Sequence, residues 1–280
     1  MNKLEFKDIE PLIDKALEED ISIGDVTTDN LIPADSQTKA TMTAKAEGVV
    51  AGLDVAEWVF KKLDANVTFT RHLNDGDRVK RGMLIAEIEG SFRALLSGER
   101  VALNFLQRMS GVASATVQYV DAIKNYKTEI LDTRKTLPGY RSLDKYSVAA
   151  GGGMNHRIGL YDMVMIKDNH IKVAGSITNA VNEIRPKIAD GIKIEVETTN
   201  LDEVKEALAA KADVIMLDNM DNTTMTEAVQ IINGAAKVEA SGNMNLARVK
   251  EVAETGVDFI SIGALTHSVM ALDISQNIEM

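Results

Sequence analysis

Two adjacent cations, Arg134 and Lys135, follow a short apolar run and precede a Pro-Gly pair in the segment LDTRKTLPGYR. An arginine guanidinium can bind a carboxylate or phosphate through two parallel hydrogen bonds, and a neighbouring lysine adds a mobile point charge. An ordinary basic loop has the same composition. The segment therefore predicts either an anion-binding loop at the end of a strand or a solvated basic turn.

A second basic group lies in the segment GGGMNHRIGLYDMVMIKDNH, where three glycines allow close approach of the backbone. His156 and Arg157 follow these glycines, and Lys167 ends an otherwise apolar run. A single histidine is more often structural than functional, but this one stands beside Arg157 and ahead of Lys167. A lysine at a strand end costs stability unless an anion meets it. We therefore interpret all three as residues of a site.

Two acids, Glu197 and Asp218, end successive apolar runs, so we expect their carboxylates to be neighbours. Mg²⁺ prefers oxygen ligands and keeps several waters, which can bridge to a diphosphate. Acids in these positions are equally suited to cap the helices that follow. Both a magnesium site and a pair of helix caps remain compatible with the pattern.

Small residues end the last two apolar runs. They are Ser241, Gly242 and Asn243 in the first case and Gly263 and Ala264 in the second. Small side chains expose backbone N–H groups near the start of a helix, which is how α/β barrels commonly bind phosphate. The pattern predicts a phosphate-binding edge.

The elements that must position these residues are six short apolar runs, each ending in a polar or small residue: EILDTRK, DMVMIKDN, IKIEVETT, ADVIMLDN, KVEASGN and FISIGAL. Helical patterns such as LDEVKEALAAK separate them, and the ends of the last four runs are spaced 21, 23 and 22 residues apart. Repeated strand–helix units with apolar strands predict a parallel sheet buried on both faces. An open doubly wound sheet would gather its polar residues at one switch point, whereas here every strand carries one at its end. We therefore favour an α/β barrel, of about six strands rather than the usual eight.

The first hundred residues have a different pattern, which predicts an α+β domain. We expect an amphipathic helix near residues 9–19, strands with turns over 38–52, a helix over 51–65 and a strand over 67–73. The segment LNDGDRVKRGMLIAEIEG resembles a hairpin, with its turn at Asp75-Gly76. A long helical stretch over 97–125 leads into the strand–helix repeats.

Composition excludes several classes of protein. The chain has 280 residues, with 45% hydrophobic and 26% charged residues, as in globular proteins, and it contains no cysteine. Disulfides, thiolate nucleophiles and cysteine-ligated zinc are therefore excluded. The first twenty residues contain no apolar signal segment, and the apolar runs are too short to span a bilayer. We expect a cytoplasmic protein with no membrane partner.

Charge is distributed unevenly along the chain. The net charge of −11 disfavours nucleic acid as a partner. Residues 131–172, however, hold seven Lys or Arg residues against four acids, a local charge of +3. A basic segment in an acidic protein indicates a local anion site, although a solvated loop with scattered lysines is the alternative.

Taken together in their order and spacing, the motifs resemble one family across nearly the whole chain. They are EDISIGDVTT, SGERVALNFLQRMSGVA, LDTRKTLPGYR, GGGMNHRIGLYDMVMIKDNH, IEVET, IMLDN, EASGN and SIGALTHS. The family is that of nicotinate-nucleotide pyrophosphorylase (carboxylating), or quinolinate phosphoribosyltransferase. The resemblance implies the conversion of quinolinate and 5-phosphoribosyl-1-diphosphate to nicotinate mononucleotide, diphosphate and CO₂, with Mg²⁺, in de novo NAD biosynthesis.

The resemblance also implies the fold and the assembly. It implies an open barrel of fewer than eight strands over residues 110–268 and an open-faced sandwich over 1–109 that the tail 269–280 rejoins. It further implies a homodimer, or a higher even oligomer, in which Arg100 of SGERVALN reaches into the site of the neighbouring subunit.

Site residues follow from the resemblance position by position. It implies that the two carboxylates of quinolinate are held by Arg100, Arg134, His156 and Arg157. It places Lys135 and Lys167 between this dicarboxylate and the phosphoribosyl group, and it brings Glu197 and Asp218 to the ribose hydroxyls and the water shell of the metal. These last four are the expected catalytic residues. Phosphate would be held by Ser241, Gly242, Asn243, Gly263 and Ala264, with His267 nearby; Asn243 stands where some relatives have a second glycine.

Three other functions are considered. A paralogue found with molybdate-transport functions shares the fold, but the complete set of cations argues against it. A Schiff-base lyase would use Lys167 as nucleophile, which requires an apolar pocket around that lysine. A biotinyl- or lipoyl-type carrier would need a lysine at an exposed hairpin tip, which LNDGDRVKRGMLIAEIEG does not offer in the usual setting.

Overall fold

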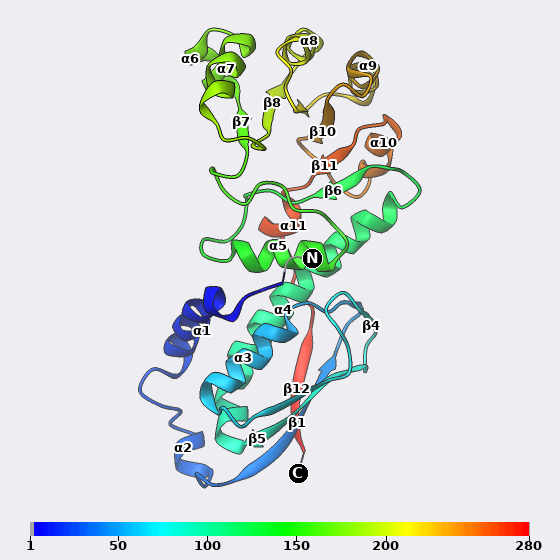
Figure 1. The fold of residues 1–280 in the computed structure, drawn as a ribbon. Helices are drawn as coiled ribbons and strands as arrows, with labels where there is room; N and C mark the ends of the chain where they lie inside the picture. The colour runs from blue at the N-terminus through cyan, green and yellow to red at the C-terminus, as the bar shows by residue number, and fades with distance from the viewer. Residues whose placement is uncertain (1–2, 280) are drawn as a thin grey trace. The chain divides into compact units, whose positions relative to one another are not determined.

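The computed structural model describes residues 3–279 and divides into two compact units. The N-terminal unit comprises Met1–Val117, Leu137–Gly152 and Val269–Met280, and the parallel-sheet unit comprises Gln118–Thr136 and Gly153–Ser268. Figure 1 shows the elements of both.

An antiparallel sheet of four strands, in the order β12-β1-β5-β3, forms the frame of the N-terminal unit. The strands are β1 (Gln37–Ala44), β3 (Thr68–Arg71), β5 (Leu84–Ser91) and β12 (Ile274–Glu279), and a separate two-stranded sheet pairs β2 (Gly48–Val49) with β4 (Arg78–Val79). Along β1, Ala40, Met42 and Ala44 are buried while the residues between them are not. One face of the sheet is therefore apolar and the other polar, as in an open-faced sandwich.

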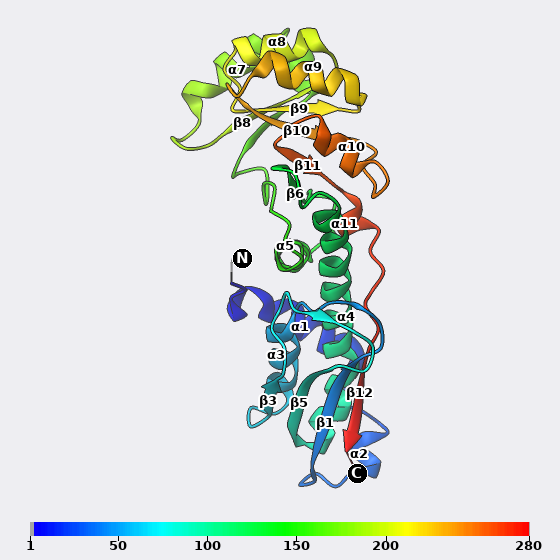
Figure 2. The same cartoon turned by 90° about the vertical axis from the view of Figure 1, so that its right-hand side faces the viewer.

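The helices of this unit are α1 (Phe6–Ile21), α2 (Thr28–Leu31), α3 (Leu53–Leu63), α5 (Arg141–Ala150) and most of α4 (Phe92–Ala122). The helix α1 forms where the sequence predicted it, because Ile9, Ile13 and Leu17 recur at helical spacing and are all buried. Figure 2 shows α3 and α4 on one side of the sheet. They cover the apolar face.

The predicted hairpin in residues 73–90 is wrong, although its turn forms. Gly76 has a positive φ of 97°, as such a turn requires. However, β4 pairs with β2, and β5 pairs with β1 and β3. The reason is that Asp75 accepts hydrogen bonds from the backbone N–H groups of Gly52 and Leu53, at 2.9 and 3.1 Å. The turn is thus tied to the start of α3, and the chain does not fold back on itself.

The C-terminal segment packs closely along α4 within the N-terminal unit. The backbone N–H of Leu272 donates to the Gln107 carbonyl at 3.0 Å, and Gln107 Nε2 donates to the Ile274 carbonyl at 2.6 Å. A Cβ atom on Gly111 would lie 2.3 Å from the carbonyl oxygen of Met270. Glycine at 111 is therefore what allows this close approach.

Six parallel strands in the order β6-β11-β10-β9-β8-β7 form the sheet of the second unit. They are β6 (Glu129–Leu131), β7 (Val164–Ile166), β8 (Ile194–Thr198), β9 (Val214–Asp218), β10 (Lys237–Ser241) and β11 (Phe259–Ser261). All six predicted strands are confirmed. Their order is that of an α/β barrel left open between β6 and β7, and only the isolated bridge from Leu131 to Met154 extends the β6 edge.

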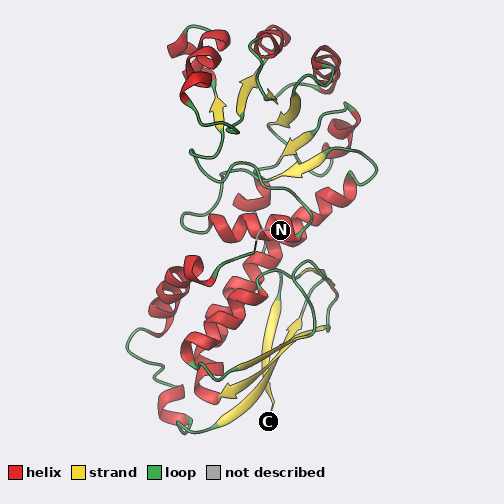
Figure 3. Cartoon of the chain, viewed as in Figure 1, coloured by secondary structure: helices red, strands yellow, loops and turns green. Residues whose placement is uncertain are grey.

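Helical segments connect these strands: α6 (Asp168–Ala174), α7 (Ile177–Ile184), the 3₁₀ turn η1 (Arg185–Lys187), α8 (Leu201–Ala209), α9 (Asn222–Ile232), α10 (Val249–Glu254) and α11 (Ala264–His267). Figure 3 shows the parallel strands in yellow and the helices in red, with α7, α8 and α9 together on the outside of the sheet. In β9 the four residues from Val214 to Leu217 are all buried, as expected for a strand covered on both faces. Over residues 3–279, none of the helices has the combination of length and apolar character that crossing a bilayer would take.

We expect Gly111→Ala to destabilise the protein, because its methyl group would lie 2.3 Å from the Met270 carbonyl. Overpacking of this kind costs about 1–3 kcal/mol, whereas alanine in an unhindered helix would gain up to about 1 kcal/mol over glycine. The measurement is the free energy of unfolding in urea. An unchanged or increased value would show that the close packing along α4 is absent.

Candidate active site

A pocket of about 360 Å³ opens at the carboxyl ends of the parallel strands. Every one of the six strands contributes a residue to it, either at its end or in the loop that follows. The lining residues are Thr133, Arg134, Lys135, His156, Arg157, Met165, Lys167, Glu197, Met216, Asp218, Glu239, Ser241 and Ser261. The four Lys and Arg side chains and the acids of β8, β9 and β10 therefore face one cavity.

Most of the predicted site residues meet in this pocket. Those that line it are Arg134, Lys135, His156, Arg157, Lys167, Glu197, Asp218 and Ser241. The predicted phosphate residues of the last strand lie beside it, since a Cβ on Gly263 would be 3.0 Å from Lys135 Cδ and 3.2 Å from the His267 ring. Ala264 begins α11 directly after Gly263. Gly242 and Asn243 follow the lining residue Ser241.

Arg100 does not line this pocket. It lies on α4 in the N-terminal unit, and its side chain is 57% exposed, with the Glu99 carboxylate 4.0 Å away. The predicted contact of Arg100 with quinolinate stays a prediction.

The two arginines of the pocket are close enough to oppose one another's charge. Burial lowers the pKa of Arg157 and the charge of Arg134 lowers it further. The Arg157 guanidinium is held in place by the Met163 carbonyl at 3.1 Å. Two opposed guanidinium groups at one cavity are stabilised by an anion between them, and a carboxylate fits their hydrogen-bonding geometry.

Lys167 makes an ion pair with Glu197 across neighbouring strands. Its side chain is 43% exposed and its ammonium contacts a carboxylate. A Schiff-base nucleophile needs a lysine in an apolar or cation-lined setting without a paired acid. The ion pair therefore argues against the lyase hypothesis.

Sequence reasoning missed two buried acids at the floor of the pocket, Glu195 and Glu239. His156 Nε2 lies 3.0 Å from a carboxylate oxygen of Glu195 and 3.3 Å from one of Glu239, and both acids are fully buried. The signal was present in the sequence, because each of the two interrupts an apolar strand, and Glu195 stands two residues before Glu197 on the same strand face. A charge inside an otherwise apolar strand is therefore a signal that could have identified both acids.

This cluster shifts the pKa values of its members. Burial alone would lower the pKa of His156, but hydrogen bonds to Glu195 and Glu239 outweigh it and raise the pKa to about 10. Burial, together with the nearby charge of Glu239, raises the pKa of Glu195 to about 7. The backbone N–H of Arg157, 2.7 Å from His156 Nδ1, suits a neutral ring. The two carboxylates dominate because both lie within ion-pair distance of the ring in a buried setting, and they favour the imidazolium.

Asp132, at the end of β6, fixes the loop that carries His156 and Arg157. One of its oxygens accepts from the His156 backbone N–H at 2.9 Å and the other from Asn155 Nδ2 at 2.6 Å. Asp132 is fully buried. The strand-end polar residue of β6 thus supports the site and does not contact its cavity.

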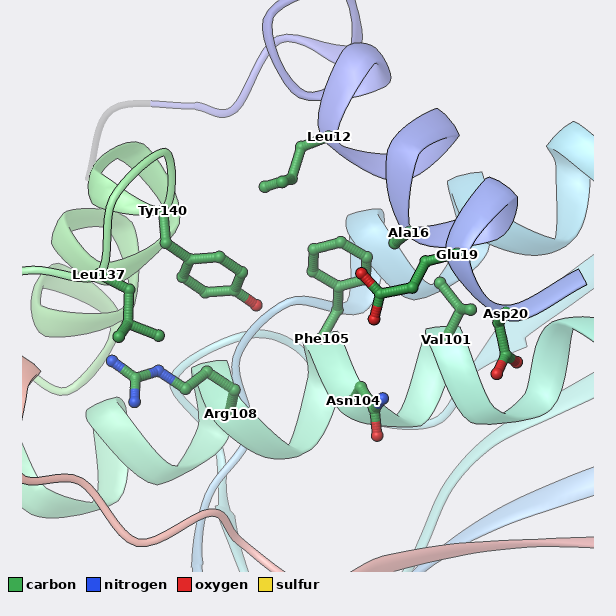
Figure 4. A pocket seen from close by; sticks show the side chains of 10 residues that line it. All are labelled: Leu12, Ala16, Glu19, Asp20, Val101, Asn104, Phe105, Arg108, Leu137 and Tyr140. Atoms are coloured by element: carbon green, nitrogen blue, oxygen red, sulfur yellow. The ribbon is translucent and has the colours of Figure 1, made fainter. Parts of the chain in front are cut away.

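A second hollow of about 280 Å³ lies in the N-terminal unit between α1, α4 and the loop before α5 (Figure 4). Its lining includes the acids Glu19 and Asp20 and the Arg108 guanidinium, which lies 3.2 Å from the buried Asp144 carboxylate and 5.9 Å from the Tyr140 ring. Phe105 stacks on Tyr140 at 5.9 Å. None of the predicted site residues lines this hollow.

The open parallel sheet, with cations and acids gathered at its carboxyl end, defines a barrel-type enzyme that handles anionic substrates. Family models agree: "Quinolinate phosphoribosyl transferase, N-terminal domain" matches residues 25–110 and "Quinolinate phosphoribosyl transferase, C-terminal domain" matches residues 112–277. The chain belongs to the quinolinate phosphoribosyltransferase family.

Curated relatives and solved structures support the same assignment. The "Probable nicotinate-nucleotide pyrophosphorylase [carboxylating]" of Synechocystis is 46% identical over 273 residues, covering 96% of this chain and 92% of the relative. The Bacillus subtilis protein of the same description is 44% identical over 280 residues, covering 100% and 96%. The crystal structure of NadC from Streptococcus pyogenes matches with a TM-score of 0.96 at 41% identity, covering 99% and 98%. The family resemblance and the fold class predicted from the sequence are thereby confirmed.

The pH dependence of stability tests the buried cluster. His156 has a raised pKa in the folded protein, so its contribution is complete below about pH 6.5 and is lost as the pH rises through about 10. We expect the free energy of unfolding in urea to fall for the wild type between pH 7 and pH 9. His156→Gln leaves two buried acids without a cation, which should cost about 3–5 kcal/mol at neutral pH.

The decisive comparison is between the wild type and His156→Gln in how the free energy of unfolding changes with pH. Glu195, with its raised pKa, makes stability fall between about pH 5 and pH 7 in both proteins, whereas only the wild type has the imidazolium whose loss lowers stability further between pH 7 and pH 9. Parallel curves for wild type and variant would mean that His156 does not carry the charge that the two acids require.

Proposed function

We propose that this chain catalyses the reaction of quinolinate with 5-phosphoribosyl-1-diphosphate to give nicotinate mononucleotide, diphosphate and CO₂, a step of de novo NAD biosynthesis. The observation that carries the proposal is the single pocket lined by Arg134, Lys135, Arg157 and Lys167 together with Glu197 and Asp218. Several cations suit a dicarboxylate and a diphosphate, and two acids suit ribose hydroxyls and a hard cation. Relatives at 44–46% identity carry the name of this activity.

The basic side of the pocket is proposed to bind quinolinate. Arg134 and Arg157, whose charges oppose each other in the free protein, would share the two carboxylates. His156, held by Glu195 and Glu239, would add a fixed positive charge at the floor. Lys135 and Lys167 would stand between the dicarboxylate and the phosphoribosyl group.

The opposite side is proposed to bind phosphoribosyl diphosphate. Glu197 and Asp218 would contact the ribose hydroxyls. Phosphate would be bound by the loops that follow β10 and β11, through Ser241, Gly242, Asn243, Gly263 and Ala264, with His267 nearby. Gly263 supports this placement, because the absence of a Cβ leaves room for both Lys135 and His267 beside it.

The carboxylates fit Mg²⁺ as the cofactor. Glu197 and Asp218 offer oxygen ligands from neighbouring strands, and each is partly exposed, which suits binding through water. Bound there, Mg²⁺ would offset the charge of the diphosphate. Glu197 is paired with Lys167, and both side chains line the pocket where the substrates would meet.

The chemistry requires orientation and charge neutralisation and does not require a nucleophile. Loss of diphosphate from the anomeric carbon passes through an oxocarbenium-like centre, so the protein must align the pyridine nitrogen and stabilise the leaving charge. Once the nitrogen is ribosylated, loss of CO₂ leaves an ylide that the ring cation stabilises. The cations of the pocket add to this stabilisation, and no covalent enzyme intermediate is needed.

The assembly is part of the proposal. A homodimer, or a higher even oligomer, would let the exposed Arg100 of one subunit complete the quinolinate site of its partner. We also propose the domain division at residue 110, with the tail 269–280 in the N-terminal domain, and a cytoplasmic location.

Activity assays test the proposed reaction directly. With quinolinate and phosphoribosyl diphosphate, the wild type should release CO₂ and nicotinate mononucleotide in equal amounts. Arg134→Ala and Lys167→Ala should each lower kcat/KM by about 100-fold or more, because each removes a charge that faces the reacting groups. Circular dichroism and urea unfolding should show that both variants remain folded.

Lys172→Ala is the matched control for Lys167→Ala, since Lys172 is a nearby exposed lysine that pairs with Asp168. It should keep wild-type turnover. Near-wild-type activity of Arg134→Ala or Lys167→Ala would remove the assigned role, and a wild type that consumes no quinolinate would favour the molybdate-associated paralogue.

Mixed dimers test the role of Arg100. We expect Arg100→Ala and Lys167→Ala chains to be nearly inactive alone and to regain up to about a quarter of wild-type activity when mixed. Random pairing makes about half of the dimers hybrids, and each hybrid contains one intact site and one defective site. The measurement is turnover after refolding differently tagged chains together, with heterodimers confirmed by tandem purification. Confirmed heterodimers without activity would contradict a shared site.

A further inference from the structure

Three residues with left-handed backbone conformation stand side by side at the ends of β9 and β10. They are Asn219, with φ 55°, Gly242, with φ 91°, and Asn243, with φ 52°. The two strands are paired in parallel, with Asp218 opposite Ser241, and the Asn219 backbone N–H donates to the Ser241 carbonyl at 3.0 Å. The acid of one strand end and the small-residue loop of the other are therefore adjacent.

The Asn219 side chain connects these two strand ends. Its Nδ2 donates to a carboxylate oxygen of Asp218 at 2.8 Å, and its Oδ1 accepts from Asn243 Nδ2 at 3.1 Å. This orientation of the amide is required, because a carboxylate only accepts hydrogen bonds and must face the NH₂ group. One side chain thus fixes both the Asp218 carboxylate and the loop that carries Asn243.

Gly242 is matched to this arrangement. A Cβ on residue 242 would lie 2.2 Å from Asn219 Oδ1 and 2.5 Å from Asn219 Cγ. The amide therefore lies directly against the glycine backbone. The close contact indicates a specific packing of Asn219 on the loop.

Arg248 makes a second connection between the same two loops. Its guanidinium donates to the Gly242 carbonyl at 3.2 Å and to the Met220 carbonyl at 2.7 Å. Arg248 holds the backbones together, whereas Asn219 reaches the functional carboxylate. Loss of the Asn219 amide should therefore leave the loops joined while freeing Asp218 to rotate.

We propose that Asn219 is a positioning residue for phosphoribosyl diphosphate, which sets the Asp218 carboxylate at a fixed place relative to the Ser241-Gly242-Asn243 loop. The inference rests on the proposed function, in which these groups bind the ribose and a phosphate of that substrate. The hydrogen bonds of the Asn219 side chain are made to Asp218 and Asn243, which belong to the proposed phosphoribosyl diphosphate side of the pocket. Substitution of Asn219 should therefore weaken the binding of phosphoribosyl diphosphate and leave the binding of quinolinate unchanged.

Asn219→Gly is the primary test. Glycine removes the amide and tolerates the positive φ, so the backbone should be retained. We expect the KM for phosphoribosyl diphosphate to rise about ten-fold, equivalent to about 1.4 kcal/mol, which is close to the lower end of the range for one hydrogen bond to a charged group. The KM for quinolinate should stay within about two-fold. Calorimetric titration with phosphoribosyl diphosphate and Mg²⁺, without quinolinate, should show the same ten-fold loss of affinity.

Two further variants sharpen the test. Asn233→Gly is the matched control, because Asn233 is another left-handed asparagine, at the end of α9 in the same unit, and it should leave both KM values and the affinity unchanged. Asn219→Asp keeps the size of the side chain but places a second carboxylate against Asp218. It should weaken the binding of phosphoribosyl diphosphate at least as much as Asn219→Gly.

The outcomes separate this inference from the reaction itself. Unchanged affinity and KM for phosphoribosyl diphosphate in Asn219→Gly would overturn the positioning role, as would an equal rise in both KM values accompanied by a lower free energy of unfolding. A wild type that binds phosphoribosyl diphosphate but forms no nicotinate mononucleotide would defeat the proposed reaction alone, and the binding comparison would still decide the role of Asn219. A wild type that binds none would overturn both.

Discussion

The site depends on keeping several like charges close together in a partly desolvated cavity. Burial lowers the pKa of the Arg157 guanidinium and the nearby charge of Arg134 lowers it further, because like charges disfavour the ionised form. Opposite charges act in the other direction: Glu195 raises the pKa of Arg157, Glu197 pairs with Lys167, and Glu195 and Glu239 lie within ion-pair distance of His156. The acids of the pocket therefore help to hold its cations together, because nearby opposite charges favour the charged forms.

A parallel sheet is the architecture that makes such a concentration of charge possible. All strands run in one direction, so residues that are far apart in the chain, from Arg134 to Ser261, arrive at one edge of the sheet. The apolar strand interiors supply the stability, while the ends carry groups that a core could not accept. Glu195 and Glu239 are the exception, since they lie inside strands and are tolerated because both contact the His156 ring.

Much of this arrangement could be predicted from the sequence because strand ends are marked by a change of residue type. The run VIMLD identifies both a buried strand and Asp218 as its terminal acid, and the same logic placed Lys167 and Glu197. Glu195 and Glu239 were missed because a charge inside a strand conflicts with burial, and the pattern does not show which cation will neutralise it. The hairpin at residues 73–90 was wrong for a related reason, since turn residues predict a bend but not the partner of the strand that follows.

The contacts that orient the side chains of the site could not be predicted from residue patterns. In the sequence, Asn219 is a polar residue that follows a strand, and Gly242 is a small residue in a predicted phosphate-binding loop. Their relation appears only when β9 and β10 are paired in the register that sets Asp218 opposite Ser241, because that register brings the amide onto the glycine backbone. The backbone has positive φ at Asn219 and at Gly242, and the Asn219 amide packs where a Cβ atom on residue 242 would lie. Sequence spacing therefore predicts which groups reach the edge of the sheet, whereas the register and the local backbone conformation determine which of them hold one another in place.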